Sequence, residues 1–250
     1  MQILSGQAIM NQIVVGPLYF YHRRELALQV RSGRSREQEE ARFRKALNQS
    51  VLELAGLYDR ASGRMDAGTA SIFAIHAMLL EDEDFVQNVL CFIKQDDVTA
   101  EYAVQRAGED FTAAFSAMDS AYMRARAADM LDISRRVIRA LTGGWQTFLL
   151  HKPVILVADH FLPSEVMEFD CNLLGLISQE GSLDSHTALL VRACHIPAMV
   201  GVPLDKMWNG HLALMDGNQG LVYVDPDLTL MEDLRVRYQE DGRPDLCIVS

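Results

Sequence analysis

The chain has 250 residues and a formal charge of −11, because 23 lysines and arginines stand against 34 aspartates and glutamates. This length allows one large domain or two small ones. With 49% apolar and 23% charged residues, the composition excludes a disordered chain. The negative charge disfavours nucleic acid and anionic membranes as partners and favours a basic protein.

The sequence points to the cytoplasm. Its apolar stretches are far shorter than the roughly 20 residues of a membrane helix, and residues 1–6 lack the basic and apolar parts of a secretion signal. The four cysteines form no CxxC pair, which indicates reduced thiols rather than a disulfide scaffold. Because His160, His195 and His211 also lack metal-ligand spacing, we expect no metal site.

Residues 13–21 are β-branched and aromatic, which predicts a strand. Residues 35–141 then contain no proline, and their apolar side chains recur at helical spacing. Helices joined by short polar connections fold as an antiparallel bundle. Helices are predicted around residues 43–61, 72–80, 85–93, 103–118 and 122–141.

After residue 144 the pattern changes to short apolar runs separated by turns. Strands are predicted at residues 154–158, 173–178, 198–202, 212–215 and 221–224, with a helix over 185–194. An isolated first strand is unstable, so we expect it to pair with this later group, which makes the bundle an insertion. The expected domains are an α/β domain of residues 1–33 and 144–228, a helical subdomain of residues 34–143, and a C-terminal linker helix or tail of residues 229–250.

His186 lies in the first turn of the helix predicted over residues 185–194. Free backbone N–H groups and the helix dipole favour an anion at that place. A neutral imidazole is nucleophilic near pH 7 and can accept a phosphoryl group. On spacing alone, however, a histidine at a helix start is more often a cap or a packed ring.

Residues 181–201, GSLDSHTALLVRACHIPAMVG, resemble the phosphohistidine signature of phosphoenolpyruvate-utilising enzymes. In that signature, Gly-Gly-x-Thr-Ser-His leads into a helix and then into Ile-Pro-Ala-x-x-Gly. The resemblance implies an α/β swivelling phosphohistidine domain with an inserted all-α helical bundle subdomain, and it places the phosphoryl group on His186. The residues expected to support the phosphate are Ser185, Thr187, Asp184 and Arg192.

The bundle narrows the resemblance to one member of the family. Residues 72–84, IFAIHAMLLEDED, and residues 126–133, RAADMLDI, look like the helical subdomain of enzyme I of the bacterial phosphoenolpyruvate:sugar phosphotransferase system, and residues 162–165 match a further stretch. This implies a phosphoenolpyruvate-protein phosphotransferase whose N-terminal part passes phosphate to the carrier protein HPr. The partner-binding residues so implied are His76, Met78, Leu79, Glu81, Asp82, Glu83, Asp84 and Arg126.

Plainer interpretations of these residues stay open. The acidic cluster of residues 81–84 is also typical of a helix N-terminus capped by Asp82 or Glu83. His76 is as readily a satisfied bundle histidine as a docking residue. Arg126 is as readily a member of a surface ion pair as a phosphate ligand.

Two positions depart from the family pattern. Asp184 stands where the signature has threonine, so its charge either opposes the phosphate or orients the imidazole. Val166 stands where the family has a threonine, a residue that is expected to contact the active histidine.

Enzyme I binds phosphoenolpyruvate and Mg²⁺ and dimerises through a C-terminal (β/α)₈ barrel, and the residues after 225 are too few to build one. We therefore expect the isolated chain to be a monomer without a cofactor of its own. Two alternatives remain open: the phosphohistidine domain of a dikinase or phosphoenolpyruvate synthase-type enzyme, and a non-catalytic HPr-binding or regulatory paralogue.

Overall fold

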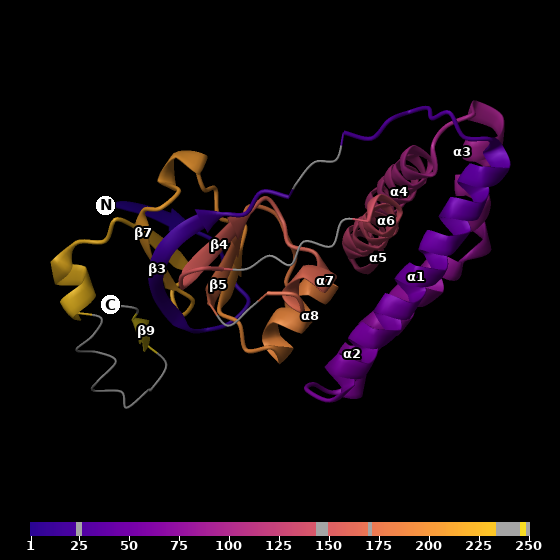
Figure 1. Ribbon diagram of the computed structural model, residues 1–250. Helices are drawn as coiled ribbons and strands as arrows, with labels where there is room; N and C mark the ends of the chain where they lie inside the picture. Colours follow the sequence, from indigo (N-terminus) through magenta and orange to yellow (C-terminus); the bar gives the residue numbers. More distant parts are fainter. Residues whose placement is uncertain (24–26, 144–149, 170–171, 234–245, 249–250) are drawn as a thin grey trace.

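The computed structural model describes the chain except for residues 24–26, 144–149, 170–171, 234–245 and 249–250. A long helical bundle and a sheet-containing domain lie side by side, with two short helices between them (Figure 1). Within the described residues, no helix combines the length and the apolar character that crossing a membrane requires.

The bundle confirms the helices expected from the apolar spacing. The last predicted helix is interrupted at Arg126, which ends one helix and begins the next. At the far end of that next helix, Gly143 adopts the left-handed conformation (φ 68°), which glycine permits at a helix C-terminus. The bundle helices are α1 (Arg36–Ser62), α2 (Ala67–Glu81), α3 (Glu83–Asp96), α4 (Ala100–Ser116), α5 (Ala121–Ala125) and α6 (Ala127–Thr142).

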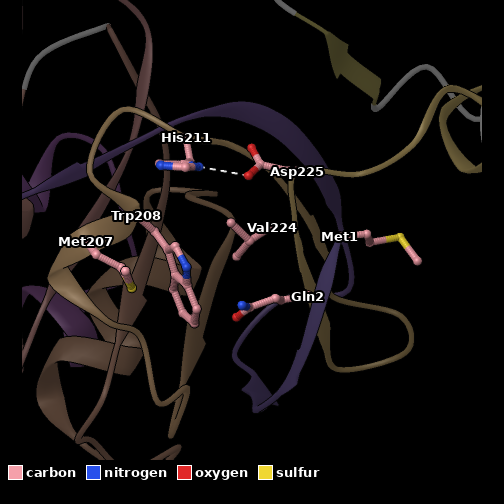
Figure 2. Close-up of a pocket in the computed structure, with 7 residues that line it drawn as sticks. All are labelled: Met1, Gln2, Met207, Trp208, His211, Val224 and Asp225. Carbon is pink, nitrogen blue, oxygen red and sulfur yellow. Dashed lines mark hydrogen bonds and ion pairs between the residues drawn. The ribbon is translucent and has the colours of Figure 1, made fainter.

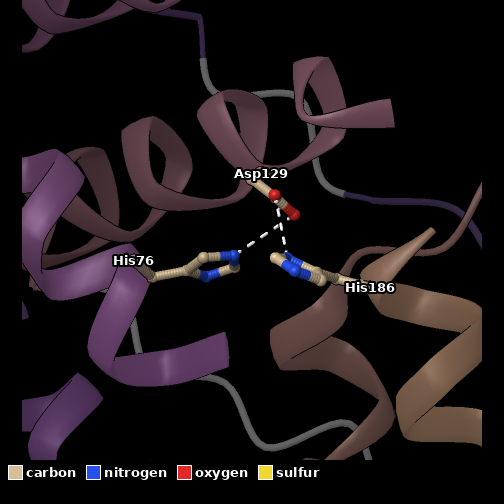
Figure 3. A group of neighbouring side chains, drawn as sticks. All are labelled: His76, Asp129 and His186. Carbon is tan, nitrogen blue, oxygen red and sulfur yellow. Dashed lines mark ion pairs between the residues drawn. The ribbon is translucent and has the colours of Figure 1, made fainter. Parts of the chain in front are cut away.

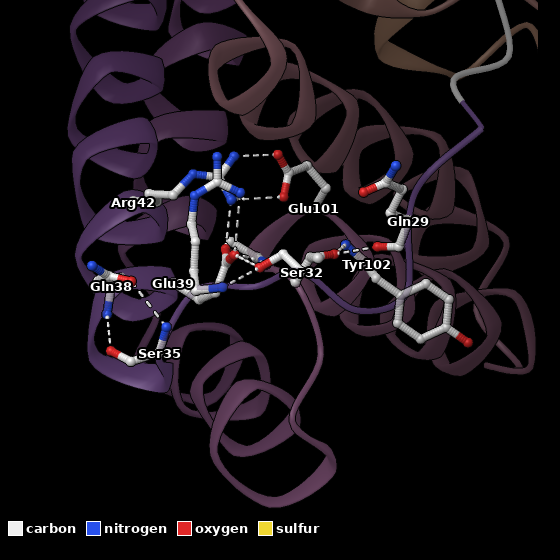
Figure 4. A network of polar contacts seen from close by, with 11 residues as sticks. Gln29, Ser32, Ser35, Gln38, Glu39, Arg42, Glu101 and Tyr102 are labelled. Atoms are coloured by element: carbon white, nitrogen blue, oxygen red, sulfur yellow. Dashed lines mark hydrogen bonds and ion pairs between the residues drawn. The ribbon is translucent and has the colours of Figure 1, made fainter.

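Polar contacts fix the beginning of α1 (Figure 4). Ser35 and Gln38 form a capping box, in which each side chain accepts a hydrogen bond from the other residue's backbone N–H. One turn later, the buried Glu39 pairs with Arg42 at 2.5 Å, and Arg42 also pairs with Glu101 at the start of α4. These ion pairs tie the first two turns of α1 to the first turn of α4.

The sheet is mixed and confirms that the first long strand pairs with strands from the second half of the chain. The strand order is β1-β8-β7-β3-β4-β5-β6-β2, with β9 also paired to β3. β3 to β6 run parallel, whereas β7 and β8 form an antiparallel hairpin. The strands are β1 (Gln2–Ser5), β2 (Gln7–Ala8), β3 (Ile13–Phe20), β4 (Val154–Ala158), β5 (Leu173–Ser178), β6 (Ala198–Val200), β7 (Leu212–Asp216), β8 (Leu221–Val224) and β9 (Leu246–Ile248).

The structure adds elements that the apolar pattern does not predict. β1, β2 and β9 are short, and a short edge strand has little periodicity to detect. The tail of residues 229–250 begins as expected, since residues 229–233 are helical, but its described end contains β9, which was not expected; residues 234–245 lie outside the described residues. The α/β domain also contains α7 (Pro163–Val166), α8 (His186–Ala193) and the 3-10 turn η1 (Lys206–Trp208), and the described residues 228–233 are helical.

One apolar core joins the two parts of the molecule. The bundle interior is continuous with Leu190 and Val191 of α8, and with Leu156 and Leu176 on one face of the sheet. All four side chains are nearly inaccessible to solvent. Because burial of apolar surface holds helix faces and sheet faces together, this core presses α8 against the bundle. It thereby fixes where the first residue of α8, His186, must lie.

Candidate functional site

His186 is the first residue of α8, and the local sequence explains why the helix begins there. The Oγ atom of Ser185 accepts a hydrogen bond from the backbone N–H of Ala188 at 3.1 Å, as an N-cap serine does. The imidazole of His186 is turned into the contact with the bundle and is only 5% exposed. The histidine that the sequence singled out therefore lies between the two parts of the molecule.

Three buried side chains from three helices meet at this contact (Figure 3). Asp129 of α6 lies between two imidazoles: its Oδ2 is 2.9 Å from Nδ1 of His186, and its Oδ1 is 3.2 Å from Nε2 of His76 on α2. The two rings are 5.9 Å apart between centroids. A single carboxylate of the bundle thus contacts both histidines.

The short contact favours one tautomer of His186. A carboxylate offers only lone pairs, so a bare Nδ1 at 2.9 Å from Oδ2 would be repelled. A proton on Nδ1 removes this repulsion, and a neutral ring then has its lone pair on Nε2. Burial alone would raise the pKa of Asp129, but its contacts with His186 and His76 outweigh burial and hold the pKa well below the usual range. The carboxylate stays charged.

Further charged groups surround Asp129. Nη1 of Arg126 lies 3.2 Å from its Oδ2, and the Arg126 guanidinium stacks over the ring of Tyr122 at 4.3 Å. One turn along α6, Asp132 accepts hydrogen bonds from both the backbone N–H and the hydroxyl of Ser164. Its Oδ2 is 3.8 Å from Nδ1 of His76. The bundle therefore supplies the charged side chains around His186.

The residues expected to support a phosphate make mainly backbone contacts. Ser185 caps α8, the Thr187 hydroxyl donates to the carbonyl of Phe161 at 3.1 Å, and Arg192 donates to the carbonyl of Leu183 at 2.9 Å. Asp184 is exposed. The carboxylate that contacts the imidazole is Asp129, so the orienting role considered for Asp184 falls to a residue of the bundle.

The expected partner-binding residues divide into two groups. Met78 is 70% exposed, Leu79 is half-buried, and the acidic residues 81–84 are exposed. His76 and Arg126, in contrast, are buried at the contact with α8. In this arrangement they do not share the exposed face of Met78 but point toward Asp129, whose buried charge they accompany.

The capping interpretation of the acidic cluster is confirmed, since the Asp82 carboxylate accepts from the backbone N–H groups of Asp84 and Phe85 at the start of α3. That role leaves the neighbouring acids free to face solvent.

Asp129 is a member of the site that was not predicted, although its sequence context carries a signal. Asp129 and Asp132 recur three residues apart on the same face of α6 as the buried Met130 and Ile133, and both are 1% exposed. Acidic side chains on an apolar helical face need a partner of opposite charge or a hydrogen-bond donor. The partner could not be named, because His186 is far away in the chain. Val166 is buried in α7, where it packs in the joint apolar core.

A cleft of about 510 Å³ lies between the two parts of the molecule, beside the N-terminus of α8. Ser182, Ser185 and Thr187 line it from the α/β domain, and Thr112 and Arg124 line it from the bundle. The cleft reaches the residues on both sides of His186 and gives space for a group that approaches the start of the helix.

A second pocket, of about 260 Å³, lies at the other end of the α/β domain (Figure 2). Trp208 and Val224 form part of its wall, and His211 pairs with Asp225 at its edge, with 2.8 Å between Nδ1 and Oδ2. Both members of this pair are largely exposed. None of the residues singled out from the phosphohistidine signature lines this pocket.

The fold and the site define a class of protein: an α/β domain that presents a histidine at a helix N-terminus to an inserted helical bundle. The family described as "PEP-utilising enzyme, N-terminal" matches residues 5–126, and the family "PEP-utilising enzyme, mobile domain" matches residues 150–220. The chain belongs to the phosphoenolpyruvate-utilising enzymes, as the N-terminal domain of an enzyme I.

Named relatives support this placement. Phosphoenolpyruvate-protein phosphotransferases of Bacillus sp. (strain S) and Geobacillus stearothermophilus are each 30% identical over 244 residues, which is 94% of this chain and 42% of theirs. The chain thus spans less than half of the length of these relatives. A solution NMR structure of Enzyme I is 28% identical with a TM-score of 0.69, covering 96% of this chain and all of that one. The N-terminal domain of "Enzyme 1 - Nitrogen", 22% identical over 94% of this chain and 99% of that one, has the same fold with a TM-score of 0.60.

Proposed function

We propose that this chain is the phosphoryl-transfer domain of an enzyme I and carries the phosphoryl group on Nε2 of His186. The observation that carries this proposal is the contact between Nδ1 of His186 and the Asp129 carboxylate, 2.9 Å long. It leaves the Nε2 lone pair as the nucleophile and places a negative charge behind the ring. Use of phosphoenolpyruvate itself belongs, in this proposal, to a part of the enzyme that the chain does not span.

His186 neither gains nor loses a proton during the transfer step. The N–P bond of the donor breaks, its electron pair returns to the donor's ring nitrogen, and Nε2 of His186 forms the new N–P bond. While the group is attached, the ring holds its proton on Nδ1 and carries a positive charge, which the Asp129 carboxylate stabilises. In the reverse direction, the same atoms pass the group to the histidine of HPr.

His186 cannot react in the arrangement described above. Its ring is 5% exposed and is enclosed between α8 and the bundle, so a donor cannot come into line with Nε2. We propose that the contact between α8 and the bundle opens on the Nε2 side of the ring before transfer, which widens the cleft beside the helix start while Nδ1 keeps its contact with Asp129. This motion agrees with the description of the matching family as a mobile domain.

The expected result that tests this function is a gain of one phosphoryl group on His186. The purified chain is mixed with phosphorylated HPr, and its intact mass is measured under alkaline conditions, in which a phosphohistidine survives. His186→Gln is expected to show no gain, while His211→Gln, changed at an exposed histidine outside the site, gains phosphate normally. A wild-type chain that binds HPr and yet gains no phosphate would contradict transfer and favour the binding-only alternative.

A second expected result concerns the docking surface for HPr. Met78 is 70% exposed beside the acids of residues 81–84, so an apolar anchor stands next to charges that steer a basic partner. Met78→Ala is expected to weaken HPr binding by about tenfold, the effect of losing an anchor worth about 1.4 kcal/mol. The measurement is calorimetry at two salt concentrations, because screening weakens the charged part of the interaction.

Leu228→Ala is the matched control for Met78→Ala. Leu228 is 82% exposed but belongs to the segment that follows the sheet strand β8, outside the bundle. Its replacement is expected to leave HPr binding unchanged. Equal losses in the two variants would show that the bundle face around Met78 is not the docking surface.

A further inference from the structure

Three atoms that bind metals lie close together at the contact between α8 and the bundle. His76, Asp129 and His186 each offer one such atom, and these atoms lie within 4.8 Å of one another. All three side chains are at least nine-tenths buried. They come from α2, α6 and α8, so only the tertiary structure assembles them (Figure 3).

The polar atoms of this cluster are poorly satisfied by one another. Both ring nitrogens of His76, Nδ1 of His186 and Oδ1 of Asp129 are buried without a hydrogen bond of good geometry, although ion-pair distances are short. Buried polar atoms nearly always have a partner in native proteins. A cation that accepts lone pairs from all three side chains would supply the missing partner.

The donor set indicates which cation. Imidazole nitrogen together with carboxylate oxygen suits Zn²⁺, and three protein ligands with a fourth position open to water form a recurrent type of zinc site. The surroundings fit as well: when Nε2 of His76 holds the ion, its Nδ1–H faces Asp132, whose Oδ2 is 3.8 Å away. A carboxylate behind a ligating histidine is the usual outer partner in zinc sites.

We propose that His76, Asp129 and His186 bind one Zn²⁺ ion, which clamps α8 to the bundle and withholds His186 from phosphoryl transfer. On binding, the ion takes the place of the proton on Nδ1 of His186, and the neutral ring then carries its proton on Nε2, so that this nitrogen has no free lone pair for a phosphoryl group. The inhibitory consequence rests on the function proposed above. The binding of Zn²⁺ to the three side chains does not depend on that function.

Replacing Arg126 tests the proposal through a gain in Zn²⁺ affinity. Its guanidinium lies 3.2 Å from the Asp129 oxygen that would ligate the ion, so it both repels the ion and competes for the ligand. Arg126→Gln is expected to tighten zinc binding. A variant that is damaged only in its packing would not gain affinity in this way.

The experiment is a calorimetric titration of the metal-free chain with Zn²⁺, together with the visible absorption spectrum of the Co²⁺ form, which reports four-coordinate geometry. The wild type is expected to bind one ion. His76→Gln, Asp129→Asn and His186→Gln should each weaken binding by about 10–100-fold or more, whereas the exposed-site control His211→Gln should bind as the wild type does. Absence of binding, or binding that is unchanged in His76→Gln, would overturn the proposal.

The clamp is tested by repeating the phosphate gain from phosphorylated HPr in the presence of Zn²⁺. The ion is expected to slow the wild type by about tenfold or more at concentrations that fill the site, and a chelator should reverse the effect. His76→Gln should be insensitive to the ion. Zinc that binds without slowing the wild type would overturn the clamp, whereas failure of phosphate gain without zinc would count only against the proposed function.

Discussion

Asp129→Asn is expected to slow the phosphate gain of His186 by about 10²–10⁴-fold, the range for loss of a residue that orients a catalytic histidine. The wild-type carboxylate keeps the proton on Nδ1 of His186, 2.9 Å away. An asparagine amide can also donate, which lets the proton move to Nε2 and blocks the nucleophile. It also removes the negative charge that stabilises the phosphorylated ring. The measurement is the rate of mass gain with phosphorylated HPr.

Two further measurements separate this positioning role from a merely structural one. Nitrogen NMR of the His186 ring should show the proton on Nδ1 in the wild type and a mixture of tautomers in Asp129→Asn. Asp216→Asn is the matched control, because Asp216 is also buried (2% exposed) but accepts backbone N–H groups in the turn after β7. It should transfer at the wild-type rate. If both variants gained phosphate equally slowly, the slowing in Asp129→Asn would result from destabilisation of the fold.

Glu165→Gln is expected to lower the free energy of unfolding by about 3–5 kcal/mol, the cost of breaking a buried ion pair on one side. Both Glu165 oxygens lie 2.7 Å from the guanidinium of Arg23, and the carboxylate also accepts from the backbone N–H of Leu162. The side chains of Glu165 and Arg23 are 9% and 19% exposed. The variant leaves the Arg23 charge without its counter-charge where water can hardly replace it.

This loss is measured as a shift of the urea midpoint at unchanged slope. Asp97→Asn is the matched control, since Asp97 pairs with Arg36 at 2.9 Å but both side chains are more than half exposed. An exposed pair contributes about 0–1 kcal/mol. Asparagine also tolerates the left-handed conformation of Asp97. If Glu165→Gln lowered the free energy of unfolding as little as Asp97→Asn does, water would be shown to screen the ion pair between Arg23 and Glu165.

The predicted elements were most accurate where periodicity is strongest. The apolar spacing in residues 35–141 predicts bundle helices, because an amphipathic helix buries one face at intervals of three and four residues. β1 and β9 were missed, because short strands that depend on a partner carry almost no local signal. The break at Arg126 was missed for a similar reason, since apolar residues continue across it.

The sequence alone predicted the domain class and the insertion of the bundle, and it singled out His186 as the candidate phosphoryl acceptor. The first two predictions follow from strand and helix periodicity, and the third follows from the resemblance of residues 181–201 to the phosphohistidine signature. Only the tertiary structure decided what His186 contacts. Asp129 and His76 reach it from α6 and α2 because the shared apolar core presses α8 against the bundle. Packing of residues distant in the chain sets such contacts, and local sequence patterns do not carry that information.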